Sequence, residues 1–247
     1  MKKACSILST ALSLTVAAMV AVMALGPPVA AEEVQSRFDP TGRLRVETHF
    51  LVGAGIDKHD VGYTTTDDTI TMSGGGGAGL GLEAGYCPHR SFEISGAFGF
   101  QSSKLSEKVE NAEGSFKRIF FRVTAKYRIP VSMAGAIKVG AGGGYYSPSD
   151  LDLDFSEVPG GAHNIYSYDG AAGFHVSGEY EHHFASWNVM NAKWSLGAGV
   201  RYYKVEYDLN TASSDGENVP LNHPDLDCIR VFDGAGVDFF GYLAAYF

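Results

Sequence analysis

The segment from Val237 to Phe247 alternates strictly, and this alternation constrains the fold more than any other feature of the chain. One face carries apolar residues and glycine: Val237, Phe239, Gly241, Leu243, Ala245 and Phe247. The other face carries Asp238, Phe240, Tyr242, Ala244 and Tyr246. Side chains in a β-strand point alternately to its two sides. The segment is therefore predicted to be a strand with one wholly apolar face.

The same alternation recurs in seven other segments, which span residues 44–54, 70–86, 92–101, 118–127, 136–145, 172–181 and 194–202. The connectors between them alternate in length. The short ones are expected near 87–90, 129–132 and 183–193, and the long ones near 57–69, 102–115, 147–169 and 208–235. An even number of strands with short turns at one end and long loops at the other is typical of outer-membrane barrels. The predicted fold class is all-β, an eight-stranded antiparallel up-and-down transmembrane β-barrel.

A soluble barrel around a ligand would also have eight alternating strands. Two features favour the membrane barrel. The polar face is rich in glycine, alanine and serine, as a narrow eight-stranded interior requires. Aromatic residues such as Tyr86, Tyr127 and Trp194 mark the ends of the apolar runs, as in the aromatic girdles of membrane barrels.

The first 31 residues have the pattern of a secretory signal peptide. Lys2 and Lys3 precede an apolar run from Ile7 to Leu25, and Val29-Ala30-Ala31 offers a small-residue cleavage site. We therefore expect a signal peptide at 1–31 and a barrel domain at 32–247. Export and the barrel pattern together predict the cell outer membrane as the location.

The charge of the chain argues against some partners. With 28 acidic and 19 basic residues, its formal net charge is −9, whereas nucleic-acid binding depends on basic patches. Segment 147–169 alone holds five acidic residues and no basic one. Because loops on a rigid scaffold commonly carry specificity, we expect an extracellular ligand, if there is one, to meet acidic outer loops.

The sequence Gly79-Leu80-Gly81-Leu82-Glu83-Ala84-Gly85-Tyr86 before a proline turn, and the Tyr246-Phe247 ending, resemble the small outer-membrane barrels of the OmpA/OmpX type. The resemblance covers residues 32–247. It implies a monomer that contacts outer-membrane lipid and is assembled by the barrel assembly machinery. It also implies an assembly signal formed by Phe247, Tyr246, Ala245, Leu243 and Phe239.

Charged residues on the inward faces are balanced in number. The basic ones are Arg45, Arg118, Arg122, Lys126, Lys138 and Arg201, and the acidic ones are Glu47, Glu83, Glu93, Glu179, Glu181 and Asp238. His175 lies on the same inward face. Since a buried charge is costly unless it is paired, we predict an ion-pair network that closes the lumen.

One constellation suggests catalysis. His175 and Ser177 share a face, as a base and a nucleophile require, and His-x-Ser resembles the outer-membrane lipid A deacylases. Those enzymes present the pair to lipid, whereas Phe174 and Val176 are predicted to take the lipid face here. The acid at the deacylase spacing is also unmatched, because position 189 is valine. We therefore assign the pair to the lumen network.

The sequence favours a structural or surface-interaction barrel whose function lies in its outer loops. The alternative is a narrow pore or transport channel for small or apolar solutes, and a lipid A-modifying enzyme is the third hypothesis. No catalytic, cofactor-binding or metal site is assigned. Asp150, Asp152 and Asp154 could bind Ca²⁺, but their alternation with Leu151 and Leu153 indicates an amphipathic strand extension.

Overall fold

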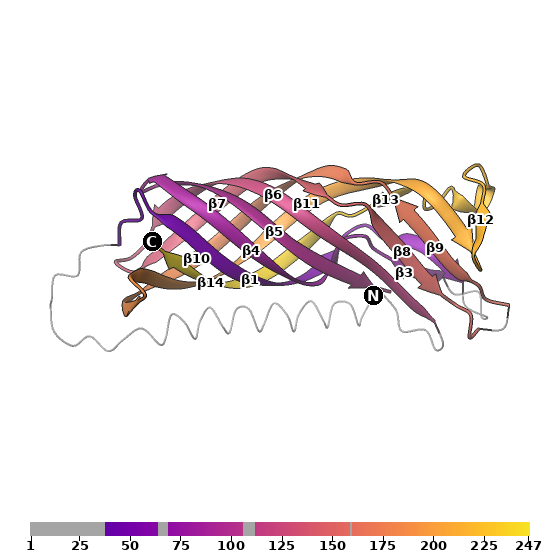
Figure 1. Cartoon of the computed structure of the whole chain (residues 1–247), viewed down its shortest axis with the longest axis horizontal. Coiled ribbons are helices and arrows are strands. Elements are labelled where there is room, and N and C mark those ends of the chain that lie inside the picture. Colours follow the sequence, from indigo (N-terminus) through magenta and orange to yellow (C-terminus); the bar gives the residue numbers. More distant parts are fainter. Residues whose placement is uncertain (1–37, 64–68, 106–111, 159) are drawn as a thin grey trace.

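A computed structural model describes residues 38–63, 69–105, 112–158 and 160–247 of the chain. The signal peptide expected at 1–31 lies outside the described residues. The described chain is all-β, and eight long strands close into one antiparallel ring (Figure 1). In ring order, these are β1 (Leu44–Gly55), β4 (Gly76–His89), β5 (Phe92–Lys104), β6 (Glu113–Pro130), β7 (Gly135–Tyr146), β10 (Ala171–Val189), β11 (Ala192–Ser214) and β14 (Gly236–Tyr246). The predicted fold class is confirmed.

The ring closes where β14 pairs with β1. Their register runs from Arg45 opposite Tyr246 to Gly55 opposite Gly236. Because each ring strand has a partner on both sides, the backbone donors and acceptors of the wall are satisfied within the sheet. Only closed barrels and helices meet this requirement inside a bilayer.

Burial alternates along the ring strands as the sequence predicts. On β6, Phe121, Val123 and Tyr127 point outward and are 57 %, 63 % and 58 % exposed, while Arg122 between them is 2 % exposed. A continuous apolar band of this kind is too large for the surface of a soluble monomer. It is the lipid-facing band of a membrane barrel.

The apolar band ends within the strands, before the strands themselves end. On β6, the outward positions that precede Ile119 are polar: Lys117, Ser115 and Glu113. On β11 the outward face changes after Tyr202 to Lys204 and Glu206. Both strands therefore continue beyond the lipid and form an outer tier at the end of the barrel opposite the short turns.

The outer tier is built largely of strands. The hairpin of β8 (Ser149–Asp154) and β9 (His163–Tyr168) lies between β6 and β11, where it takes the place that β7 and β10 occupy in the membrane. β12 (Glu217–Val219) and β13 (Val231–Asp233) also pair with β11. The expectation of long loops at 147–169 and 208–235 was therefore wrong in part, because the protruding strands β6 and β11 offer free edges that these segments pair with. The predicted strand extension at Asp150–Asp154 is confirmed by β8.

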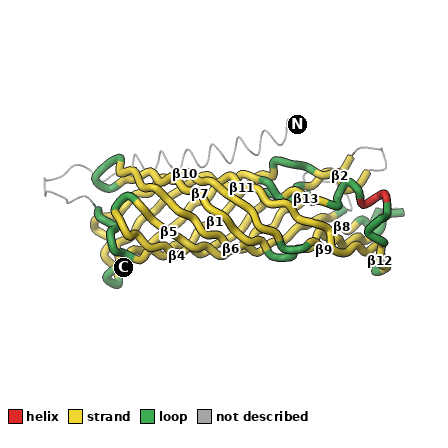
Figure 2. The backbone as a smooth tube through the Cα atoms, turned by 90° about the horizontal axis from the view of Figure 1, so that it is seen from above, coloured by secondary structure: helices red, strands yellow, loops and turns green. Residues whose placement is uncertain are grey.

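A separate two-stranded sheet joins β2 (His59–Tyr63) and β3 (Thr69–Met72). The single strand predicted over 70–86 is interrupted between Met72 and Gly76, because Gly76 and Gly77 take φ values of 75° and 90° that favour glycine. A short 3₁₀ helix, η1 (Pro224–Leu226), lies at the outer end (Figure 2). No helix among the described residues is long and apolar enough to cross a membrane.

The opposite end of the barrel carries tight turns. Arg90-Ser91 joins β4 to β5, and residues 131–134 join β6 to β7. The connector expected at 183–193 is shorter than predicted, because β10 and β11 continue to a two-residue turn at Met190-Asn191. Both residues have positive φ, 58° and 59°, which matches the right-handed twist of the strands that a tight hairpin joins.

Candidate functional site in the barrel lumen

Arg45 on β1 organises the half of the lumen nearest the short turns. Its side chain is fully buried. One terminal nitrogen donates to Glu93 at 2.6 Å and to Glu83 at 3.2 Å, and the other donates to Glu47. The guanidinium thus links carboxylates from β1, β4 and β5.

Two lysines extend these contacts around the ring. Lys126 on β6 lies 2.5 Å from Glu83 and 2.9 Å from Glu179. Lys138 on β7 lies 2.8 Å from Glu181 and 3.4 Å from Glu93. We call these residues the ion-pair layer: Arg45, Glu47, Glu83, Glu93, Lys126, Lys138, Glu179 and Glu181. The layer joins six of the eight ring strands across the lumen.

Additional residues close the layer on the side of the short turns. Tyr246 and Ser195 donate hydrogen bonds to Glu181 at 2.9 Å and 2.6 Å. Arg128 lies 2.5 Å from His183, whose ring stacks on Phe38 with a centroid separation of 4.0 Å. Sequence analysis did not count Arg128 and His183 among the lumen charges, because both lie at the ends of alternating runs. Extending the alternation two residues further would have found them.

The residues assigned to the assembly signal divide between the two faces of β14. Tyr246 is fully buried in the lumen, where its hydroxyl donates a hydrogen bond to Glu181. Leu243 and Phe247 point outward and are 42 % and 56 % exposed. Alternation puts Phe239 and Ala245 on the same side of the strand, where Phe239 is half-buried and Ala245 is buried at 6 % exposure.

The middle of the lumen holds three buried arginines. Arg118 donates to Gln101 at 2.6 Å and to the Gly74 carbonyl oxygen at 2.5 Å, and it also contacts the Tyr203 hydroxyl. Gln101 in turn donates to Asp238 at 2.7 Å. Asp238 therefore reaches Arg118 through the amide of Gln101 and not through a direct ion pair.

Arg122 and Arg201 differ from Arg45 in what their guanidinium groups contact. Among the described residues, no ion pair joins either guanidinium to a carboxylate. Arg122 instead packs 3.7 Å from the centroid of the Phe120 ring, and Arg201 packs 4.6 Å from that of Phe240. Of the inward basic residues on β6, Lys126 and not Arg122 meets a glutamate of β10. The register places Arg122 opposite Gly144, whereas Glu179 lies opposite Lys138.

His175 and Ser177 face the lumen, as their lipid-facing neighbours predict. His175 Nε2 lies 2.8 Å from the Thr124 hydroxyl, and Ser177 Oγ lies 3.5 Å from Glu179. The two side chains are 1 % and 6 % exposed. Each has its own partner, so they do not form the contact that a base and a nucleophile need.

Above the arginines, the lumen is filled by an apolar and aromatic core that continues into the outer tier. Its buried members include Leu51, Met72, Phe116, Tyr146, Leu151, Leu153, Tyr168, Val205, Tyr207 and Phe232. The interior is therefore charged near the short turns and apolar near the outer end. Alternation located these inward positions, but residue type had suggested that aromatics belong to the lipid interface.

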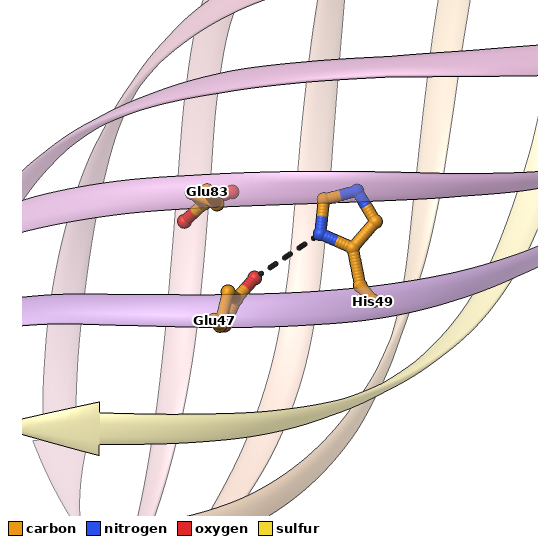
Figure 3. Close-up of side chains that lie close together, drawn as sticks. All are labelled: Glu47, His49 and Glu83. Atoms are coloured by element: carbon orange, nitrogen blue, oxygen red, sulfur yellow. Dashed lines mark ion pairs between the residues drawn. The ribbon is translucent and has the colours of Figure 1, made fainter.

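Glu47, His49 and Glu83 form the group of described side chains that could hold a metal ion. Figure 3 shows them converging from β1 and β4 inside the barrel. Their ligand atoms lie within 4.8 Å of one another, and all three residues are buried.

The outer tier has its own charged contact. His163 on β9 lies 2.9 Å from Asp152 on β8, on the exposed face of the hairpin. The hydrogen bond from His163 to Asp152 raises the pKa of the imidazole above its ordinary value. Hydrogen bonds from the hydroxyl and backbone of Ser156 lower the pKa of Asp154.

No protein family and no curated protein matches the sequence. Solved structures resemble the chain over most of its length. The outer membrane protein OprG from Pseudomonas aeruginosa is 12 % identical, with 87 % of this chain and 99 % of OprG covered and a TM-score of 0.49. Neisserial surface protein A is 12 % identical, with 83 % of this chain and 96 % of that protein covered and a TM-score of 0.44. Ail of Yersinia pestis is 13 % identical, with 83 % of this chain and 98 % of Ail covered and a TM-score of 0.40. At these identities the comparisons bear on neither ligand nor activity.

Proposed function

We propose that the chain is an outer-membrane scaffold: a barrel with a closed lumen that displays a rigid acidic surface outside the cell. The observation that carries this proposal is the contrast between the two halves of the barrel. The membrane half is filled with ion pairs, and the outer tier is a sheet that holds its acidic side chains in solvent. The signal peptide expected at 1–31 and the assembly signal on β14 fit delivery to the outer membrane.

The closed lumen is supported by the ion-pair layer and the core above it. An eight-stranded barrel is only just wide enough for its own side chains. Lys126 on β6 bridges glutamates on β4 and β10, and Lys138 on β7 bridges glutamates on β5 and β10, at 2.5–3.4 Å. These contacts pass inside the ring, and all but that of Lys138 with Glu181 join strands that are not adjacent. Phe116 and Tyr168, fully or nearly fully buried, fill the outer half. A continuous water path would have to break both layers.

The acidic surface is supported by the geometry of β8. Asp150, Asp152 and Asp154 point outward, and Leu151 and Leu153 between them are fully buried. The aspartates are therefore held at strand spacing by a packed hairpin, which lowers the entropy cost of binding. A partner with basic groups at a similar spacing would fit this face.

Conductance tests the closed lumen. The refolded protein in a planar bilayer should show no single-channel steps, and Arg45→Ala combined with Lys138→Ala should show none either, because the aromatic core above the ion pairs remains in place. Regular channel openings in the wild type would contradict a closed scaffold.

Binding of a lysine-rich peptide tests the acidic surface. The triple change Asp150→Asn, Asp152→Asn and Asp154→Asn should weaken this binding in low salt. The matched control is the triple change Asp60→Asn, Asp208→Asn and Glu217→Gln, which removes the same number of exposed acids from outside β8. Equal loss in both variants would indicate a general charge effect and would remove β8 as the interaction surface.

The second candidate function is passage of small apolar solutes, and the apolar outer lumen favours it. Along β6 the paired strand changes from β7 to β8, which are linked by Ser147-Pro148. Along β11 it changes from β10 to β9, which are linked by Asp169-Gly170. Backbone bonds from Ser147 to Ile119 at 2.9 Å and from Asp169 to Asp208 at 3.0 Å close this junction. Uptake of an apolar solute by proteoliposomes that contain the protein, without ion conductance, would favour this candidate.

A lipid A deacylase role has the least support. Its nucleophile would have to reach lipid, and Ser177 is buried in the lumen with Glu179 as its partner. We propose that the chain has no enzymatic role of this kind, and unchanged lipid A in cells that express the protein would agree.

A further inference from the structure

Two carboxylates of the ion-pair layer leave one oxygen unused. Glu47 gives Oε2 to Arg45, and Glu83 gives Oε1 to Arg45 and Lys126. The other oxygens, Oε1 of Glu47 and Oε2 of Glu83, are buried and have no hydrogen-bond partner among the described residues. A buried carboxylate oxygen without a partner costs free energy, so these two atoms mark a place where a ligand would be stabilising.

His49 lies beside the two glutamates. The residue is 1 % exposed, and within the described structure neither ring nitrogen accepts or donates a hydrogen bond. Its Nδ1 lies 3.4 Å from Oε1 of Glu47 (Figure 3). The ring is accommodated because residue 81 is glycine, where a Cβ atom would lie 2.0 Å from Nε2 of His49.

The register adds electrostatic strain to this arrangement. Glu47 on β1 lies directly opposite Glu83 on β4, and like charges in directly opposed positions destabilise a sheet. A cation between Glu47 and Glu83 would offset the repulsion within this opposed pair.

We propose that Glu47, His49 and Glu83 form a buried site for a divalent transition-metal ion of the Zn²⁺ class. One imidazole nitrogen and two carboxylate oxygens suit Zn²⁺ better than Ca²⁺ or Mg²⁺, which take oxygen ligands. Two ligands at about 2.0–2.1 Å from a tetrahedral Zn²⁺ lie roughly 3.4 Å apart. This is the separation of Nδ1 and Oε1, and Glu83 lies within reach of both.

The ion would act as a structural cross-link. It would join β1 to β4 beside the strand pair that closes the ring, and it would satisfy polar atoms that the protein leaves without partners. Arg45 and Lys126 would keep their hydrogen bonds, because they use the other oxygens. This inference rests on the lumen geometry and is independent of the proposed surface role.

Metal content of the full refolded chain tests the site. After treatment with chelator, the protein in detergent micelles is dialysed against Zn²⁺ and analysed for bound metal by mass spectrometry. We expect one more equivalent of Zn²⁺ in the wild type than in His49→Gln or Glu47→Gln. The control is His175→Gln, which removes another buried lumen histidine, one that already has Thr124 as partner, and it should retain the ion. His163→Gln controls for binding at the outer tier.

Two results would overturn the proposal. One is folded wild-type protein that binds no Zn²⁺, and the other is equal binding by the wild type and His49→Gln. A β-sheet circular dichroism spectrum together with cooperative urea unfolding in micelles shows that a variant is folded. If the variants do not fold, X-ray absorption of the Zn²⁺-loaded wild type decides. One imidazole with oxygen ligands at about 2.0–2.1 Å supports the site, and a shell with several imidazoles or with sulfur contradicts it.

Discussion

Arg118 on β6 donates a hydrogen bond to the carbonyl oxygen of Gly74 at 2.5 Å. Gly74 belongs to the buried segment between β3 and β4, where every residue from Met72 to Gly76 is buried. A strand facing solvent or lipid would alternate, so this segment lies inside the outer end of the barrel. The contact fastens it to the wall, and the segment thereby helps to fill the lumen above the arginines.

This close packing predicts a steric response at Gly75. A Cβ atom there would lie 1.9 Å from the carbonyl oxygen of Ala235. Because the obstacle is backbone and cannot rotate away, Gly75→Ala should lower the free energy of unfolding by about 1–3 kcal/mol or more. Urea unfolding in micelles measures the change.

Gly96→Ala is the matched control for Gly75→Ala. Gly96 lies on the outward face of β5, and its Cβ would meet no atom within 4 Å. Replacement of a strand glycine should there be neutral or stabilising by about 0.5–1 kcal/mol. Equal destabilisation of the two variants would contradict the buried position of the Gly74 segment.

The contrasting surroundings of two arginines predict a large loss of folding stability when one is replaced and a small loss when the other is replaced. Arg45→Met leaves Glu47 without its cation and Glu93 with Lys138 alone in a dry environment, and it should cost about 3–5 kcal/mol. Arg122→Met removes a buried charge that pairs with no carboxylate among the described residues, so the loss should stay below about 1 kcal/mol. Comparable losses in urea unfolding would show that Arg122 has an electrostatic partner of equal weight.

Period-2 alternation was sufficient to predict the barrel, its strand count and the face of each lumen residue, because a one-residue shift would expose every inward charge to lipid. It could not predict which charges pair. Glu179 meets Lys126 and not Arg122 because cross-lumen contact depends on strand tilt and stagger, which a single sequence does not encode locally. The β8–β9 hairpin was foreseen only at β8, because the edges that it pairs with exist only after β6 and β11 have formed.

The proposed metal site at Glu47 and Glu83 could not be predicted from the sequence for the same reason. The two residues are 36 positions apart and become opposite partners only through the β1–β4 register. His49 falls on the inward side of the alternating segment 44–54, but its lack of a hydrogen-bond partner is a property of the packed lumen.

Two of the three cysteines predict an asymmetric labelling pattern. Cys87 is buried near the short turns, and Cys228 is exposed at the outer end. The membrane band that separates these ends is about 25 Å tall. An impermeant maleimide should therefore label Cys228 on intact cells and leave Cys87 unlabelled.

A Cys228→Ser variant controls this labelling. It should lose the signal on intact cells and gain none until the protein is unfolded, when Cys87 becomes accessible. Labelling of Cys87 in the folded protein on intact cells would reverse the orientation assigned to the barrel.

The pair formed by His163 and Asp152 predicts how the outer tier responds to pH. The hydrogen bond between them, at 2.9 Å, holds the pKa of His163 above 6.5. Because the folded pKa is the higher one, the stabilisation is fully present below the unfolded pKa and is lost as pH rises through the folded value. The β8–β9 hairpin should therefore loosen toward neutral and alkaline pH. NMR titration of the His163 ring should give a midpoint above 6.5, and Asp152→Asn should lower it. Asp227→Asn, an exposed acid elsewhere in the outer tier, should leave it unchanged, and a midpoint insensitive to Asp152 would rule out this contact as the cause.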